Sequence, residues 1–275
     1  MTGDIERAIT LTTFGNEFLR NNIDISVVSL NHPSFKSVNS ITFYIFKKHF
    51  WYKPTWHYYA NTIDEWFNKL KLDGCQEIRL SYFPNIPLAL NEEKLEEFKL
   101  AGFVGGGGKR YIKTIFRNHC DFWESKERVT DANAPNQKIW SVNYNRVIWG
   151  ESIQDEQKYN IDDIRAKLES ALQAIAAFAK MESLSFWEEW FLTAIDLLDS
   201  RKQSERIYNM LPENHFSSNV IQLLASADKA WCFGGMGSWN DIGFFETEKN
   251  TLYKKLSSDL YNVVNESYTA VANLY

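Results

Sequence analysis

Three adjacent side chains, His119, Cys120 and Asp121, are the residues of this chain best suited to nucleophilic or metal chemistry. Consecutive side chains diverge by about 100° on a helix and alternate between the two faces of a strand, so these three cannot converge on one atom by themselves. A nucleophilic Cys120 would need a base brought by the fold, for which His57 and His215 are the candidates. The pattern therefore favours a buried, inert thiol over a catalytic one.

No other spacing of ligand or acid residues indicates a metal centre or a hydrolase. The three cysteines, Cys75, Cys120 and Cys232, are odd in number and widely spaced, which fits neither a disulfide framework nor a zinc ribbon. Acidic pairs such as Asp162-Asp163 fall in the first turns of expected helices, where the helix dipole favours them. The sequence also contains no Gly-x-Ser-x-Gly pattern that would indicate a serine mechanism. We therefore expect no metal and no cofactor.

A glycine run followed by two cations, Gly105–Gly108 with Lys109 and Arg110, has the composition of a phosphate-binding loop. The register does not fit that motif. With Lys109 as its lysine, the first glycine position is occupied by Phe103, and Arg110 stands where a magnesium-binding hydroxyl is required. The run is better interpreted as a flexible connector.

The aromatic cluster 50–59 contains two candidate partner-binding residues, Trp51 and Trp56. Its rings, together with Lys47, Lys48 and Lys53, could stack the bases of a single-stranded nucleic acid. Aromatic side chains also cap hydrophobic cores and anchor protein interfaces. Because the chain is acidic overall, we consider nucleic acid unlikely and favour these last two roles.

The segment 231–241, which includes Gly234, Gly235 and Gly237, predicts a tightly folded turn because glycine reaches positive φ without steric cost. We expect Gly234 to end a helix and Gly235 and Gly237 to adopt positive φ. The residues after the turn have two possible roles, packing against the helices or contacting a partner. The candidate partner-binding residues here are Trp239, Asn240 and Asp241.

Periodicity and capping patterns place these segments in an α+β fold, with a mixed N-terminal region of strands and helices and a predominantly helical C-terminal region. Thr62 with Glu65, and Ser185 with Glu188, form capping-box patterns that each open a helix. Strands are expected over 23–30, 40–46, 77–82, 111–116 and 138–144, and helices over 5–21, 62–74, 91–102, 161–179, 185–198, 218–229 and 248–273.

The net charge also differs between the N-terminal and C-terminal regions. Residues 1–150 contain 19 Lys and Arg against 16 Asp and Glu, a net charge of +3, whereas residues 151–275 contain 11 against 19, a net charge of −8. We take 1–150 and 151–275 as the two regions of what can also be one continuous domain. No apolar run approaches the length of a membrane span, and the N-terminus lacks a secretory pattern, so we expect a cytoplasmic protein without membrane contact.

The segment Phe233-Gly-Gly-Met-Gly-Ser-Trp-Asn-Asp241, followed by a terminal helix, resembles the tail of small uncharacterised bacterial proteins. The whole chain resembles the immunity proteins of bacterial polymorphic toxin systems. This resemblance implies a non-enzymatic protein that neutralises a cognate toxin, and the acidic C-terminal half would favour a basic toxin domain. The alternative is an enzyme of unknown class acting on a small molecule or nucleotide between the two regions, with Cys120, His119, Lys109 and Asp241 as its candidate groups.

Overall fold

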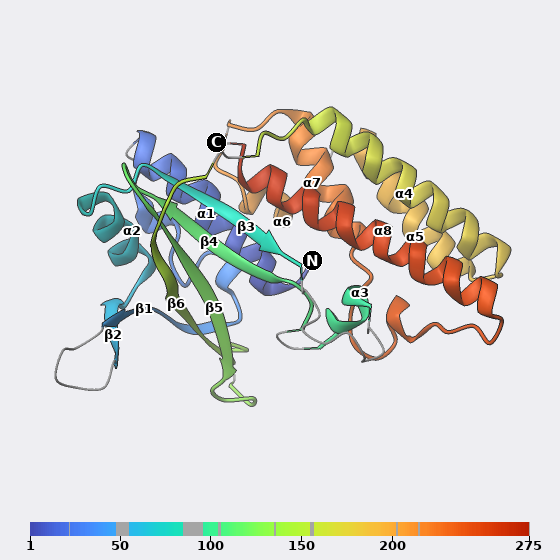
Figure 1. The fold of residues 1–275 in the computed structure, drawn as a ribbon, viewed down its shortest axis with the longest axis horizontal. Helices are drawn as coiled ribbons and strands as arrows, with labels where there is room; N and C mark the ends of the chain where they lie inside the picture. Colours follow the sequence, from blue (N-terminus) through green and yellow to red (C-terminus); the bar gives the residue numbers. More distant parts are fainter. Residues whose placement is uncertain are drawn as a thin grey trace.

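The computed structural model describes residues 1–21, 23–47, 55–84, 96–103, 106–134, 136–154, 157–201, 203–213 and 215–274. A six-stranded sheet with two helices lies beside a group of long helices, and the two parts give the molecule an elongated shape (Figure 1). The strands are β1 (Val38–Lys47), β2 (Thr55–Ala60), β3 (Glu77–Phe83), β4 (Lys109–Ile115), β5 (Cys120–Val129) and β6 (Trp140–Glu151). The helices are α1 (Gly3–Asn21), α2 (Ile63–Leu72), α3 (Glu97–Leu100), α4 (Ile161–Met181), α5 (Ser185–Asp199), α6 (Glu205–Asn209), α7 (Ser218–Ala230) and α8 (Thr247–Ala272). The expected α+β class is confirmed.

The sheet has the order β2-β1-β6-β5-β4-β3, and every neighbouring pair is antiparallel except β1 and β6, which are parallel. Four of the five expected strands are present. The strand expected over 23–30 is wrong, because this segment forms the short 3₁₀ helix Ile25–Val27, in which the Asp24 carboxylate accepts a hydrogen bond from the Ser26 N–H. Strand β5 was not expected from the sequence.

Helices α1 and α2 lie behind the sheet in Figure 1 and cover one of its faces. Residues directly opposite one another on neighbouring strands point to the same side, so the pairing defines both faces. The other face carries a row that crosses all six strands, and we call this side of the sheet the open face. The row consists of Tyr58, Tyr44, Asn145, Glu124, Tyr111 and Ser81.

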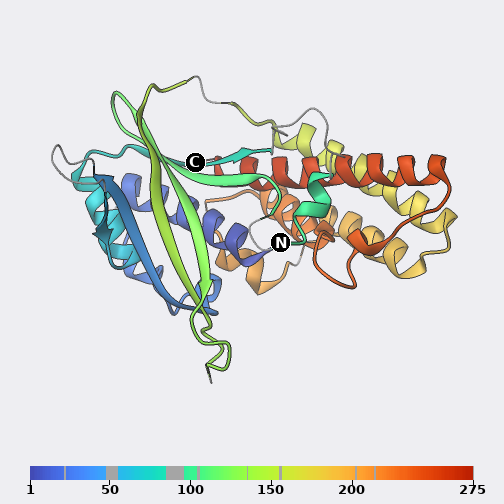
Figure 2. The same ribbon diagram turned by 60° about the horizontal axis from the view of Figure 1, so that its bottom comes forward.

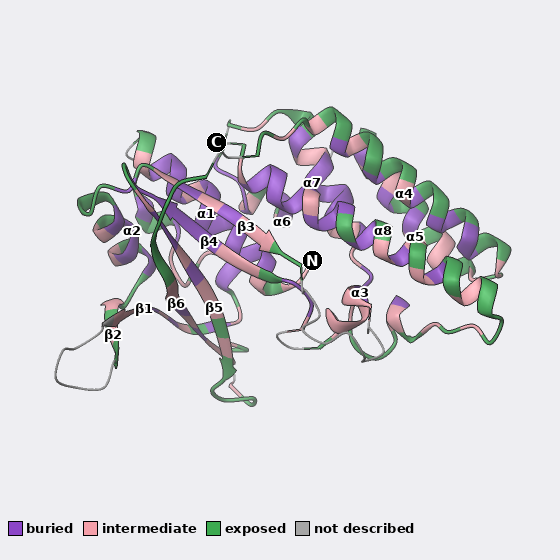
Figure 3. Ribbon diagram, in the orientation of Figure 1, coloured by how far each residue is buried: buried purple, intermediate pink, exposed green. Residues whose placement is uncertain are grey.

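Helix α1 lies between the sheet and the long helices and contributes to both hydrophobic cores. Its first turns place Ile5 and Ile9 in the core of the helical part, whereas Leu11 and Phe18 belong to the core beneath the sheet. Burial on all sides is visible along the helix in Figure 3. Helix α1 of the region 1–150 therefore shares a core with the helices of the region 151–275.

Two asparagine side chains close the β3 edge of the sheet. The Asn16 amide of α1 accepts from the Ile78 N–H at 2.8 Å and donates to the Ile78 carbonyl at 2.7 Å. Asn273, just after α8, makes the same pair of bonds with Leu80, at 2.7 and 2.8 Å. Each amide thus supplies the donor and the acceptor that another strand would supply.

The helical part consists mainly of α4, α5, α7 and α8, which confirms the expected set of four long helices. Helix α4 begins where the Asn160 side-chain oxygen Oδ1 accepts from the Asp162 N–H. The expected capping box at Ser185 is wrong, since Ser185 is the first helical residue and the cap position is held by Leu184 without a side-chain bond. At Thr62, by contrast, the hydroxyl accepts from the Glu65 N–H as expected. None of the described helices combines the length and apolar character needed to cross a bilayer.

We predict that Asn16→Ala lowers the free energy of unfolding by about 2–4 kcal/mol, because it leaves the N–H and C=O of Ile78 without partners, at about 1–3 kcal/mol for each buried group. Ile78 is fully buried, so water cannot replace the amide. Chemical denaturation measures the change. Asn68→Ala on the exposed surface of α2 is the control, and equal stability of the two variants would contradict the role of Asn16.

Candidate functional site

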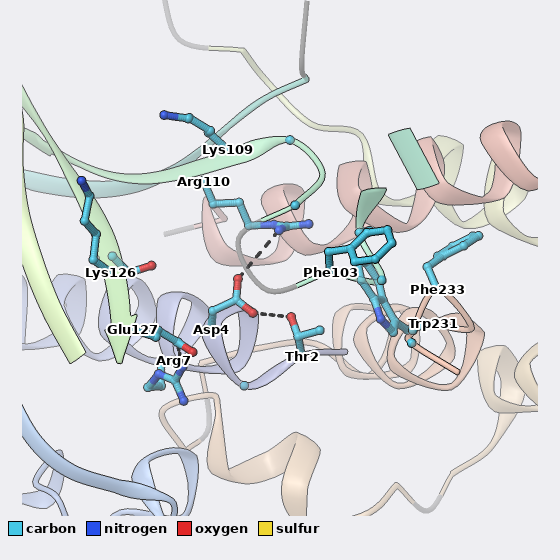
Figure 4. Close-up of a pocket in the computed structure, with 18 of the residues that line it drawn as sticks. Thr2, Asp4, Arg7, Phe103, Lys109, Arg110, Lys126, Glu127, Trp231 and Phe233 are labelled. Carbon is cyan, nitrogen blue, oxygen red and sulfur yellow. Dashed lines mark hydrogen bonds and ion pairs between the residues drawn. The ribbon is translucent and has the colours of Figure 1, made fainter. Parts of the chain in front are cut away.

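A pocket of about 790 Å³ lies where the sheet meets the helical part (Figure 4). Strand β4 diverges from β5 at this point, and the pocket occupies the space between them. The N-terminus of α1 forms one wall, and the chain around Trp231 and Phe233 forms another. Figure 2 shows the N-terminus of the chain at the same junction between the two parts. The enzyme hypothesis expected a pocket between these two regions.

Both glycine-rich segments of the sequence line this pocket. Gly102, Gly106 and Gly108 come from the connection between α3 and β4, and Gly234 and Gly235 from the later turn. The two segments touch, because a Cβ atom on Gly102 would clash with the Gly234 carbonyl oxygen. Close approach of two backbones thus explains the glycine at position 102.

The turn after α7 is built differently from the expectation. Only Gly237 of its glycines adopts a positive φ, at 84°, and its N–H donates to the Asp241 carboxylate. The expected positive φ at Gly235 is wrong, as is the expected helix cap at Gly234, because α7 already ends at Ala230.

The three candidate partner-binding residues after this turn lie in different environments. Trp239 is fully buried, donates from Nε1 to the Ser257 hydroxyl at 2.7 Å and packs edge-on against Phe191. Asn240 donates from Nδ2 to the carbonyl oxygens of Phe98 and Gly234, at 3.0 and 3.2 Å. These contacts give Trp239 and Asn240 a packing role. Only Asp241 of the three is exposed.

The charged groups of the pocket are mostly paired with one another. Arg7, at 3% exposure, forms an ion pair with Glu127, although its Nε has no hydrogen-bond partner. Arg110 bonds to the Asn265 side-chain oxygen, and its Nη1 lies 3.9 Å from the Asp4 carboxylate. The guanidinium of Arg110 also lies over the rings of Tyr82 and Trp231, with 5.1 and 5.9 Å between its Cζ and the ring centroids.

The groups proposed for an enzyme do not come together. Of the four, Lys109 alone lines the pocket, and it pairs with Glu124 at 3.0 Å. Cys120 and His119 lie at the opposite end of β5, where the His119 ring stacks on Phe116 at 4.6 Å between centroids. Among the described lining residues no thiol or imidazole is present, so the cysteine and histidine of the enzyme hypothesis lie outside this pocket.

Asp121, the third residue of the triplet 119–121, has a structural role. It is 2% exposed, accepts from Arg146 Nη1 at 2.9 Å and also accepts from the Gly150 N–H. The carboxylate therefore stabilises the pairing of β5 with β6. No group of three or more metal-binding side chains was found within the described ranges.

The open face carries two groups of aromatic rings. Tyr44 packs against Tyr58 and Phe46 against Trp56, with tilted rings whose centroids are 4.7 and 5.2 Å apart, at the β1–β2 side of the sheet. A second group, formed by Phe83, Tyr111 and Phe122, lies on β3, β4 and β5. The candidate residue Trp56 is 46% exposed here, and Trp51 lies outside the described residues.

Asn145 and Glu124 lie between the two groups of rings, and further polar side chains follow along β1 and β6. Thr42 donates to Asn143 at 2.7 Å, and Ser40 and Ser141 bond at 2.9 Å. Sequence reasoning found Trp56 but missed the rest of this surface, because β5, which joins its two halves, was not recognised as a strand. Comparison with known proteins adds no assignment, since no family model, curated protein or solved structure matches this chain.

Two tryptophans should respond differently to truncation. Trp239→Ala is expected to lower the free energy of unfolding by about 3–5 kcal/mol, because it empties a fully buried site. Trp56→Ala should cost less than about 1 kcal/mol, since half of that ring is in water. Urea denaturation of both variants measures the difference, and a Trp239→Ala protein of unchanged stability would show that the turn is not held by this ring.

The three cysteines are expected to be unreactive toward a thiol reagent in the folded protein. All three are buried, and burial raises the pKa of Cys75 to about 12 and the pKa of Cys232 well above its usual range. At pH 8 we expect slow labelling of the native chain and complete labelling in denaturant, followed with Ellman's reagent. Fast native labelling of Cys120 would restore the nucleophile hypothesis.

Proposed function

We propose that this chain is a non-enzymatic protein-binding protein that recognises its partner through the open face. The observation that carries the proposal is the sheet face opposite α1 and α2, on which two groups of exposed aromatic rings lie beside polar side chains. Tyr58 is 63% exposed, Trp56 46% and Phe83 50%. A monomeric protein has no folding reason to place so many rings in water on one surface.

The composition of the open face matches that of protein recognition surfaces. Tyrosine and tryptophan provide large, rigid contact areas at a small entropic cost, and serine and asparagine provide adaptable hydrogen bonds. The row across the sheet contains both kinds, with Tyr44, Asn145 and Tyr111 facing the same side. A partner that covers this face would bury the rings and bond to the polar groups between them.

Within this proposal, the partner is a bacterial toxin and the chain its cytoplasmic immunity protein. That part depends on the resemblance of the whole chain to immunity proteins and of the turn before Asp241 to small bacterial proteins. The expectation of a basic toxin came from the acidic helical half. The open face instead carries Lys126 and Arg128, both exposed, so a toxin that docks there should present acidic groups to β5.

The partner should be recoverable by affinity purification from the native host at low salt. We expect a stoichiometric protein with the unmodified chain, and its loss with the double variant Trp56→Ala/Tyr58→Ala. The matched control is Phe186→Ala/Leu192→Ala on α5, because these side chains have the same exposures, 63% and 46%. The captured protein, expressed alone, should arrest growth, and co-expression should restore it.

Three results would contradict the proposal. Recovery of free monomer alone at low salt would remove the protein partner, and recovery of RNA in place of protein would assign the rings to base stacking. A partner lost equally from both double variants would place the interface elsewhere. Melting temperatures of all variants must agree before their binding is compared.

A further inference from the structure

Beside the pocket, one edge of β5 pairs with none of the strands that the structure describes. Pairing of β4 with β5 begins at Tyr111 and Glu124, so the residues of β5 after Glu124 pair on one side only, with β6. Figure 4 shows β4 leading away from β5 at this point, with Lys126 and Arg110 on either side of the space. The pocket lining includes Ser125, Lys126 and Glu127 in succession, which means that it touches the edge of the strand rather than one face.

The hydrogen-bond pattern identifies the free backbone groups. The Thr130 N–H donates to the Ile139 carbonyl, so Thr130 forms a hydrogen-bonded pair with β6. Such pairs alternate along antiparallel strands. The N–H and C=O groups of Ser125, Glu127 and Val129 therefore point away from β6, into the space that β4 leaves. No described strand pairs with them there.

The chain treats the outer edge of β3 and this part of the β5 edge differently. Along β3 the asparagine amides of α1 and α8 satisfy the backbone, whereas along this part of β5 no side-chain amide does so. Exposed strand edges are usually protected by charge, and Lys126 and Arg128 prevent pairing with another copy of the same edge. The same two cations would attract a strand that carries acids.

We propose that the β5 edge from Ser125 to Val129 binds an acidic peptide segment in extended conformation, added as a strand in the space beside β4. The side chains of an added strand alternate between the two faces of the sheet. Those on the open face would lie beside Lys126 and Arg128 and should be Asp or Glu. Those on the other face would enter the pocket beside Trp231 and Phe233 and should be apolar.

This inference specifies the partner chemistry of the proposed function and rests on it, because the edge adjoins the open face through Lys126. Its test uses the chain alone. A displayed library of random peptides of about eight residues is selected against the immobilised protein. We expect enriched sequences with acids at alternate positions and apolar residues between them.

Binding of the best selected peptide is then measured by fluorescence anisotropy. We expect Lys126→Glu/Arg128→Glu to weaken it at least about tenfold, through repulsion of the acidic side chains. Lys158→Glu/Lys180→Glu, which reverses two exposed charges of the helical part, should leave it unchanged. A peptide N-methylated at those alternate amides that face β5 should not bind the unmodified protein, because it cannot pair with the edge.

The inference is overturned if no sequence is enriched, if the enriched peptides are not acidic, or if N-methylation or the Lys126/Arg128 reversal has no effect. The N-methylated peptide tests the edge on the unmodified protein, so a folding defect of a variant cannot imitate its result. Trp56→Ala/Tyr58→Ala should bind the peptide normally. Failure of the open face and failure of the edge are thus distinguishable.

Discussion

Two side-chain amides connect the sheet to the helices, because Asn16 and Asn273 complete the backbone bonding of β3. A buried strand edge requires such partners, since unpaired peptide groups cannot be left away from water. This requirement accounts for the unusual character of α1, which is buried yet carries many polar residues. The hydroxyls of Thr12 and Thr13 return to carbonyl oxygens of their own helix, and Thr13 also bonds to the Met210 carbonyl. The helix can therefore be enclosed by two cores without being apolar.

The sequence patterns predicted those elements in which local periodicity and burial agree, such as α4 with its long apolar stripe. They failed where tertiary partners replace apolar residues. Strand β5 directs Asp121 and Glu127 toward the covered face, where Arg146 and Arg7 neutralise them, so its alternation of apolar and polar residues is lost. The segment 23–30 failed for a local reason. Its alternation is typical of a strand, but the Asp24 side chain competes successfully for the backbone and forms a turn.

The site was predictable in its parts but not in its assembly. Both glycine-rich segments are recognisable in the sequence by their backbone freedom, and both line the pocket. Their contact through Gly102 and Gly234 depends on how two distant segments fold, which no local pattern contains. The same limit applies to the tryptophans. Trp239 and Trp56 lie in equally aromatic surroundings in the sequence, yet one is fully buried and the other is half exposed.

One side of the sheet is held by the helices, and the other side carries the groups that we propose for binding. The helices lie behind or beside the sheet, and their amides and cores satisfy its covered face and its β3 edge. The rings of the open face lie on the side away from α1 and α2, the part of the β5 edge without a described partner strand lies at the pocket, and Lys126 belongs to both. A rigid sheet held from behind can present such groups without rearrangement, which lowers the entropic cost of binding. The fold therefore favours recognition by a preformed surface. The pocket at the margin of this surface would receive the part of the partner that extends past the open face.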